Sequence, residues 1–104
     1  MQDQGDRTLQ TSSQIISALA SVLAKGGNFR VLFEKSNGDI RYMSVSRLMG
    51  MRDDLVTVYD DIKQDIRRFK ISKTLCIELN LENPPMNENQ IQTIKQKYIS
   101  RKSG

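Results

Sequence analysis

The sequence predicts a mainly β, α+β domain: a small five-stranded barrel with a helix before it and a short helix after it. Three observations support this fold class. Short runs in which apolar and polar residues alternate follow one another between 29 and 79, the period of half-buried strands. The pair Asn37-Gly38 separates two of these runs, as in a tight hairpin. Apolar residues at helical spacing occur on either side of the runs, at 15–23 and 91–99.

The length and composition suit one small domain. The chain has 104 residues, of which 38% are hydrophobic and none is tryptophan, so we expect a small core. The expected divisions are a flexible N-terminus at 1–10, the helix and barrel at 11–80, and a Pro-Pro linker with a basic helix at 81–104. No apolar run approaches the roughly 20 residues that span a bilayer. The first residues do not resemble a signal peptide, so we expect a cytoplasmic protein with no membrane partner.

The first helix is expected to begin at 11–13, where Thr and Ser can accept a hydrogen bond from the first turn. Gly26-Gly27 ends it, because glycine takes the left-handed conformation readily. Lys25 is its only charged residue, so the helix either covers one end of the barrel or contacts another subunit. Its apolar stripe consists of Ile15, Ile16, Leu19, Val22 and Leu23.

The barrel strands are expected at 29–34, 40–46, 55–59, 66–71 and 74–79. Asn37 and Gly38 are expected as the two central residues of a type I′ turn, in which both have positive φ. Residues 47–54 are expected as a loop. The two methionines of this loop either plug one end of the barrel or form an adaptable contact surface.

Pro84-Pro85 ends the barrel, because proline suits neither a helix interior nor a central strand. Asn87 and Gln90 resemble a capping box at the start of a second helix. That helix either docks on the barrel or becomes ordered on a partner. Its thin apolar stripe consists of Ile91, Ile94, Tyr98 and Ile99.

A basic surface is the best candidate for a site. Small barrels bind single strands by stacking bases on aromatic side chains beside a cationic groove. The opposing interpretation places Phe69 in the core and pairs the cations with Asp60, Asp61 and Asp65; residues 28–79 carry ten cations and eight anions. The expected nucleic-acid-binding residues are Arg41, Tyr42, Arg67, Arg68, Phe69, Lys70, Lys73, Lys95, Lys97 and Arg101.

The sequence offers little for catalysis. It has no histidine and one cysteine, which excludes an intrachain disulfide and the usual zinc sites. Cys76 falls inside an expected strand and is interpreted as structural. The acidic pairs 53–54 and 60–61 lie where turns favour Asp. We therefore expect a non-enzymatic protein with no metal and no cofactor.

Several short segments resemble a known family. Residues 29–33, 37–41, 55–60, 67–71 and 75–77 are similar to the WYL-type domain and to the small SH3-like, Sm-like barrel proteins of bacteriophages. Asp54-Leu55-Val56 stands where that family has its Trp-Tyr-Leu signature. The resemblance implies a ligand-sensing or nucleic-acid-contacting barrel, encoded by a phage and acting in the host cytosol. With one helix before the barrel, major-groove reading by a helix-turn-helix is not expected.

The function expected from the sequence is binding of single-stranded RNA or DNA through the basic barrel surface. The alternative is a protein–protein interaction module. Such a module would bind or inhibit a host protein, or would assemble into a homo-oligomer through the edges of its barrel.

Overall fold

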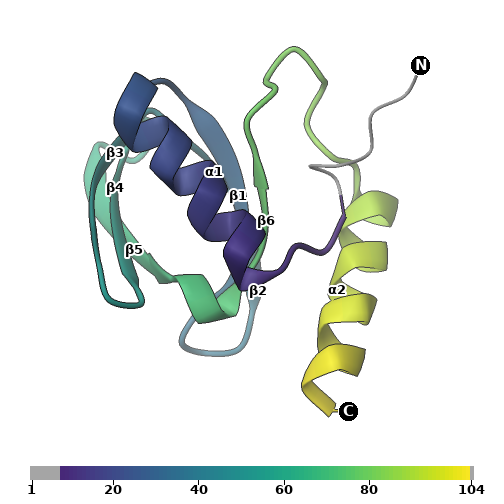
Figure 1. Cartoon of the computed structure of the whole chain (residues 1–104). Helices are drawn as coiled ribbons and strands as arrows, with labels where there is room; N and C mark the ends of the chain where they lie inside the picture. Colours follow the sequence, from purple (N-terminus) through teal and green to yellow (C-terminus); the bar gives the residue numbers. More distant parts are fainter. Residues whose placement is uncertain (1–7, 104) are drawn as a thin grey trace.

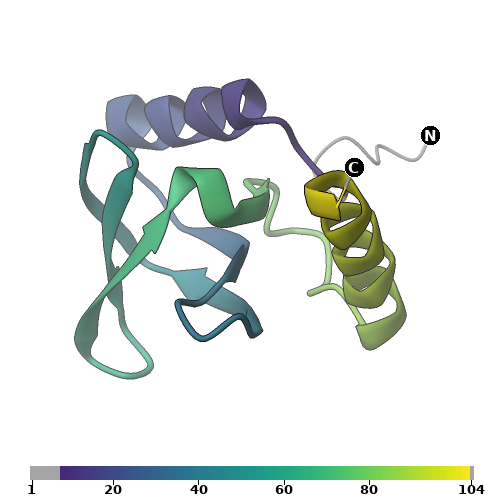
Figure 2. The same ribbon diagram turned by 90° about the horizontal axis from the view of Figure 1, so that it is seen from below.

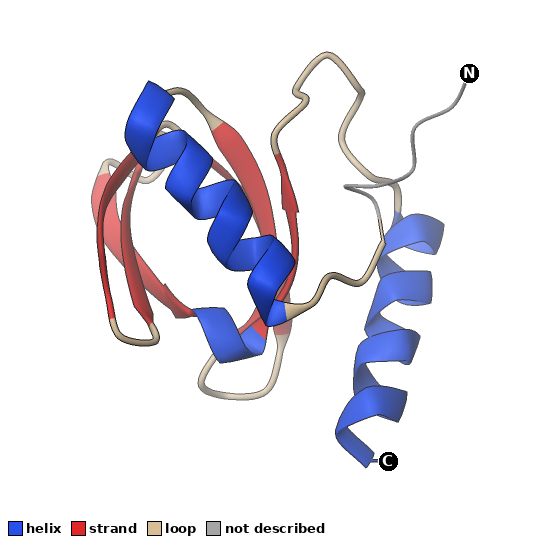
Figure 3. Ribbon diagram, in the orientation of Figure 1, coloured by secondary structure: helices blue, strands red, loops and turns tan. Residues whose placement is uncertain are grey.

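The computed structural model describes residues 8–103, which form a small α+β protein with two three-stranded antiparallel sheets (Figure 1). One sheet has the strand order β2-β1-β6 and the other β3-β4-β5 (Figure 3). The expected α+β class is confirmed. The elements in chain order are α1 (Ser12–Lys25), β1 (Phe29–Glu34), β2 (Ile40–Val45), β3 (Arg47–Arg52), β4 (Leu55–Asp60), β5 (Asp65–Lys70), the 3₁₀ helix η2 (Ile71–Lys73), β6 (Thr74–Glu78) and α2 (Glu88–Ser103).

Both helices begin with the caps that the sequence predicts. Thr11 and Gln14 form a complete capping box on α1. On α2 the backbone N–H of Asn87 donates to the Gln90 side chain at 2.9 Å, and the N–H of Gln90 donates back to the Asn87 side chain at 2.9 Å. Helix α1 ends at Gly26, where φ is +75°. A cap of this kind stabilises a helix by about 1 kcal/mol.

The hairpin between β1 and β2 lies where the sequence places it, but its turn is of another type. Of the two expected positive-φ residues only Gly38 has one, at +93°, and Asn37 does not. The N–H of Gly38 donates to the carbonyl of Lys35, and the N–H of Lys35 donates to the carbonyl of Asp39. The central residues are therefore Ser36 and Asn37, and Gly38 occupies the left-handed position that closes a three-residue loop.

The expected loop at 47–54 is wrong, because β3 occupies most of it. Strand β3 pairs with β4 from Arg47 opposite Tyr59 to Arg52 opposite Leu55, and the register shifts between Leu48 and Gly50. This raises the number of strands from the expected five to six. Its burial does not alternate cleanly, which is why the sequence pattern of a strand is weak here. Only one residue separates β2 from β3, so the chain passes directly from one sheet into the other.

Two clusters of buried side chains hold the protein together. The larger cluster joins α1 to both sheets and contains Phe29, Val31 and Phe33 from one face of β1. The opposite face of β1 contributes Leu32 to the second cluster, with Met86, Ile94 and Tyr98 from the C-terminal part. Helices α1 and α2 lie on different sides of the molecule (Figure 2). Strand β1 is consequently buried on both faces.

Helix α2 is docked on the sheet, which decides between the two alternatives left open by the sequence. Tyr98 is 3% exposed and Ile94 2% exposed. The segment that leads to α2 is also held, because Arg30 donates to the Asn83 carbonyl at 3.1 Å and the Met86 N–H donates to the Tyr42 hydroxyl at 3.1 Å. Within residues 8–103, no helix is both long enough and apolar enough to cross a membrane.

The outer edge of β6 is covered by Gln10, which lies two residues before the start of α1. Gln10 donates its backbone N–H to the Leu75 carbonyl at 2.8 Å. Its side-chain amide accepts from the Ile77 N–H at 3.0 Å and donates to the Ile77 carbonyl at 3.2 Å. Gln10 thus supplies the hydrogen bonds that a neighbouring strand would make. An edge satisfied in this way is protected from pairing with another chain.

We expect Gln10→Ala to lower the free energy of unfolding by about 1–3 kcal/mol, because the substitution leaves a buried N–H and a buried carbonyl of Ile77 without partners. Urea denaturation measures this change. Gln96→Ala is the matched control, since Gln96 is exposed. Equal stability of the two variants would contradict the edge-capping role of Gln10.

Candidate functional site

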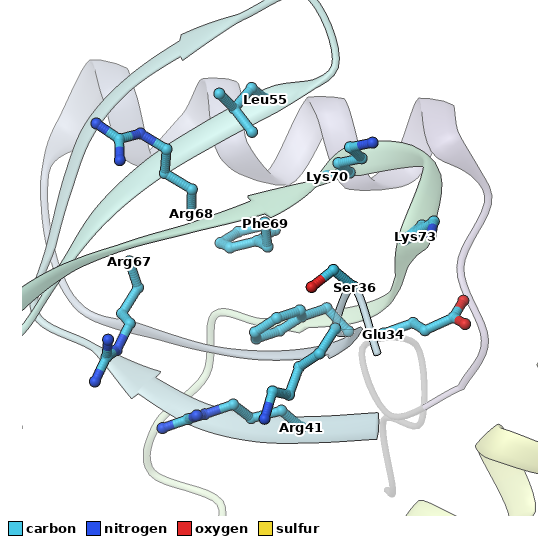
Figure 4. Close-up of a pocket in the computed structure, with 11 residues that line it drawn as sticks. Glu34, Ser36, Arg41, Leu55, Arg67, Arg68, Phe69, Lys70 and Lys73 are labelled. Atoms are coloured by element: carbon cyan, nitrogen blue, oxygen red, sulfur yellow. The ribbon is translucent and has the colours of Figure 1, made fainter. Parts of the chain in front are cut away.

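A basic groove lies between the end of the β1–β2 hairpin and the end of β5 (Figure 4). Its volume is about 450 Å³. In Figure 4 the side chains of Arg41 and Arg67 lie at one end, and those of Glu34 and Lys73 lie at the other. The residues that line it are Phe33, Glu34, Lys35, Ser36, Arg41, Leu55, Arg67, Arg68, Phe69, Lys70 and Lys73.

Two phenylalanines form the floor of the groove. The rings of Phe33 on β1 and Phe69 on β5 stack with their centroids 5.3 Å apart and an interplanar angle of 29°. Phe33 is 5% exposed and Phe69 3% exposed, so neither ring has a free face on which a base could stack. Of the two interpretations of Phe69, the core residue is therefore confirmed.

The walls of the groove carry cations that are mostly free of acidic partners. Arg68 and Lys70 are exposed, and Arg41 and Lys73 are half-buried. Among residues 8–103, none of these four takes part in an ion pair. The exception on the walls is Arg67, which lies 3.5 Å from the exposed carboxylate of Asp65.

The expected neutralisation by Asp60 and Asp61 does not extend to the groove. The carboxylate of Asp60 is buried and accepts backbone N–H groups from Ile62 at 3.0 Å and Lys63 at 3.2 Å. Asp61 is exposed in the turn that follows. Asp60 thus builds the β4–β5 turn, as the sequence predicts for this acidic pair.

The turn after β5 is fixed by Asp54, at the start of β4. The Asp54 side chain accepts the backbone N–H of Ser72 at 2.9 Å and also the Ser72 hydroxyl. The Asp54 carbonyl accepts the N–H of Ile71 at 2.8 Å. These bonds hold η2 against the second sheet. The positions of Lys70 and Lys73 on the groove wall follow from this anchoring.

Glu34 is the single carboxylate among the described residues that line the groove. The Tyr98 hydroxyl donates to it at 2.6 Å, and Lys102 Nζ lies 3.0 Å from the same oxygen. These two hydrogen bonds, and then the charges of Lys102 and Lys73, lower the pKa of Glu34 below its ordinary value of 4.5. Burial and the hydrogen bond to Glu34 raise the pKa of Tyr98, so its hydroxyl remains a donor at neutral pH.

Four of the residues expected in the site do not reach the groove. Tyr42 faces away from it, and its hydroxyl donates to Glu78. Lys95 lines a separate cavity between α2 and the hairpin, and Lys97 is exposed on α2. Arg101 donates to the Gln10 carbonyl at 3.2 Å and lies over the Tyr98 ring. The groove therefore unites Arg41, Arg67, Arg68, Phe69, Lys70 and Lys73.

Five groove residues were not predicted from the sequence: Phe33, Glu34, Lys35, Ser36 and Leu55. The sequence did indicate that the residues at the end of β1 lie near Arg41, because a hairpin at 36–38 places that end of β1 beside Arg41 on β2. No local signal marks Leu55, which reaches the groove because it pairs with Lys70.

Two other kinds of site would depend on metal ligands or on the single thiol in the described part of the chain. No group of three or more acidic, cysteine or histidine side chains lies close enough to hold a metal ion within residues 8–103. Cys76 is 1% exposed and belongs to the second core cluster. This burial agrees with a structural role for its thiol.

The Glu34 contacts predict a specific dependence of stability on pH. A carboxyl group whose folded pKa is lowered adds stability above its unfolded pKa, here about 4.5, and that stability is lost as pH falls through the folded pKa. We expect the urea midpoint of Glu34→Gln to fall less than that of the wild type between about pH 5 and about pH 2.5. Glu82→Gln, which changes an exposed carboxylate, should follow the wild-type curve. Parallel curves for all three proteins would refute the assigned role of Glu34.

Comparison of the chain with protein families, with curated proteins and with solved structures finds no match. The function of the groove is therefore inferred from its geometry and its charge.

Proposed function

We propose that this chain is a non-enzymatic nucleic-acid-binding protein whose basic groove holds the phosphates of a single strand. The observation that carries the proposal is a set of five wall cations that take part in no ion pair among residues 8–103: Lys35, Arg41, Arg68, Lys70 and Lys73. Unpaired lysine and arginine side chains gathered along one groove are the usual electrostatic footprint of a polyanion site.

The volume of the groove and its buried floor favour contacts with the phosphates of one strand over contacts with its bases. About 450 Å³ is the volume of a small-ligand pocket, which can take part of one backbone and not a duplex. Phe33 and Phe69 are covered, so base stacking is not available. We infer a binding mode that depends on phosphate contacts, tolerates any sequence and fixes the strand through charge.

We also propose that the fold is a small SH3-like barrel. Only Ser46 separates β2 from β3, which supports counting them as one strongly bent strand and gives five strands in all. The stacked Phe33 and Phe69 support closure of this barrel, since they join β1 of one sheet to β5 of the other.

Binding of a labelled single-stranded oligonucleotide, as RNA and as DNA, should weaken steeply with salt. With four phosphate contacts the slope of log K against log salt is about −3, which is roughly a fifty-fold loss between about 50 and about 200 mM. We expect similar affinities for oligo-A and oligo-U. Absence of binding at the lower salt concentration would reject the proposal.

A charge-matched pair of variants locates the site. Replacing Arg68, Lys70 and Lys73 by Ser should reduce affinity by at least about tenfold and bring the salt slope close to about −1. Replacing Lys25, Lys95 and Lys97 by Ser changes the net charge equally but leaves the groove intact. A larger loss in the second variant would move the site to the helices.

A second candidate function is self-association through α1, which one observation favours. Ile16 is 46% exposed and Leu23 50% exposed, and a spacing of seven residues puts both on one helix face. Assembly through the edge of β6 is opposed by Gln10, which already occupies that edge. We therefore propose that a dimer, if formed, packs α1 against α1 of a second copy.

We expect the mass from light scattering to rise with concentration in the wild type and to stay monomeric in Ile16→Ser/Leu23→Ser. Ser17→Ala/Ala20→Ser is the control, because both residues are exposed on α1 and their volumes change little. A wild type that is monomeric at the highest concentration would exclude this second function.

A further inference from the structure

Glu34 connects the groove to the C-terminal helix. It lines one end of the groove, and its side chain is 11% exposed. Two α2 residues hold its carboxylate, Tyr98 at 2.6 Å and Lys102 at 3.0 Å. On the groove side, the positive charge of Lys73 also lowers the pKa of this carboxyl group. Helix α2 and the groove therefore share this acidic group.

Helix α2, through Tyr98 and Lys102, and the groove, through Lys73, compete for the negative charge of Glu34. While Tyr98 and Lys102 engage Glu34, Lys73 is in no ion pair among residues 8–103. If α2 released Glu34, the carboxylate would lose the positive charge of Lys102 and would face the groove, where the charge of Lys73 acts on it. It would then repel an incoming phosphate and reduce the share of Lys73 in binding it.

We propose that α2 sets the anion affinity of the groove by keeping Glu34 engaged with Tyr98 and Lys102, which leaves Lys73 available to a phosphate. This inference rests on the proposed nucleic-acid function. Lys102 and Tyr98 act as positioning residues, because their effect on the ligand passes through Glu34. The coupling is reciprocal, so a bound strand stabilises the docked helix.

The helix remains docked when the Lys102 contact is lost, which makes the inference testable. Ile94, Tyr98 and Met86 are buried in the second core cluster, to which Lys102 does not belong, although its Nζ lies 5.1 Å from the centroid of the Tyr98 ring. Arg101 also ties α2 to the Gln10 carbonyl. A variant at Lys102 should therefore fold, and its affinity can be compared with that of the wild type.

The experiment is a double-mutant cycle on binding of a single-stranded oligonucleotide at about 50 mM salt. We expect Lys102→Met to weaken binding about fivefold, the lower end of typical coupling between sites. In the Glu34→Gln background, where the carboxylate charge is absent, Lys102→Met should have no effect. Lys97→Met is the control for loss of one positive charge from α2, since Lys97 is exposed and lies outside the groove.

A second readout separates coupling from a direct contact. Addition of the oligonucleotide should slow amide hydrogen exchange along α2 in the wild type and should do so less in Lys102→Met. Lys102→Met that weakens binding equally in both backgrounds would show a direct phosphate contact and overturn the inference, as would equal losses for Lys102→Met and Lys97→Met. Those results leave the proposed function standing, whereas a wild type that binds no oligonucleotide overturns both.

Discussion

The contact between Phe33 and Phe69 is the interaction on which the rest of the structure depends. The two rings belong to different sheets, and β1 and β5 share no backbone ladder. Such a stack adds about 0.5–1.5 kcal/mol beyond the burial of its area. It joins β1 of one sheet to β5 of the other and makes the floor of the groove. Around this floor, Arg68 and Lys70 flank Phe69 on β5, and Arg41 on β2 pairs with Phe33.

The same contact explains why the groove is apolar below and basic above. Side chains alternate along a strand, so burial of Phe69 forces Arg68 and Lys70 outward. Arg67 shares the side of Phe69 and becomes half-buried at the rim. Glu34, at the end of β1, introduces the one negative charge among the described residues that line the groove, and Lys102 on α2 pairs with it.

Local patterns predicted most of the fold. The alternation of apolar and polar residues identified five of the six strands to within one residue at each end, and the capping residues identified the start of both helices. Strand β3 was missed because Met49 and Gly50 break the alternation at a shift in register, and only pairing with β4 makes the segment a strand. The predicted type I′ turn was wrong because Lys35 hydrogen-bonds to Gly38 and Asp39, so the central residues are Ser36 and Asn37, one position earlier than expected.

The candidate site was predicted in part. The cluster at 67–73 was found because charges close in sequence stay close on one strand and the turn after it, whereas Arg41 joins them from β2 of the other sheet. Tyr42 was wrongly predicted to line the groove. Its hydroxyl contacts Glu78 and the segment before α2, and the sequence alone does not indicate which face of β2 meets those residues. Glu34 was not recognised, since its importance comes from Tyr98 and Lys102, more than sixty residues later.

The hydrogen bonds of Gln10 also bear on the order in which the molecule folds. Gln10 and Ile77 are 67 residues apart in the sequence, so this pairing closes a very long loop. The entropy of closing such a loop opposes this pairing until the intervening strands are in place. During synthesis, Gln10 cannot make these bonds until β6 has emerged. Arg101, on α2, also donates to the Gln10 carbonyl, so the segment before α1 is held by residues from β6 and from the C-terminal helix, the last elements to be made.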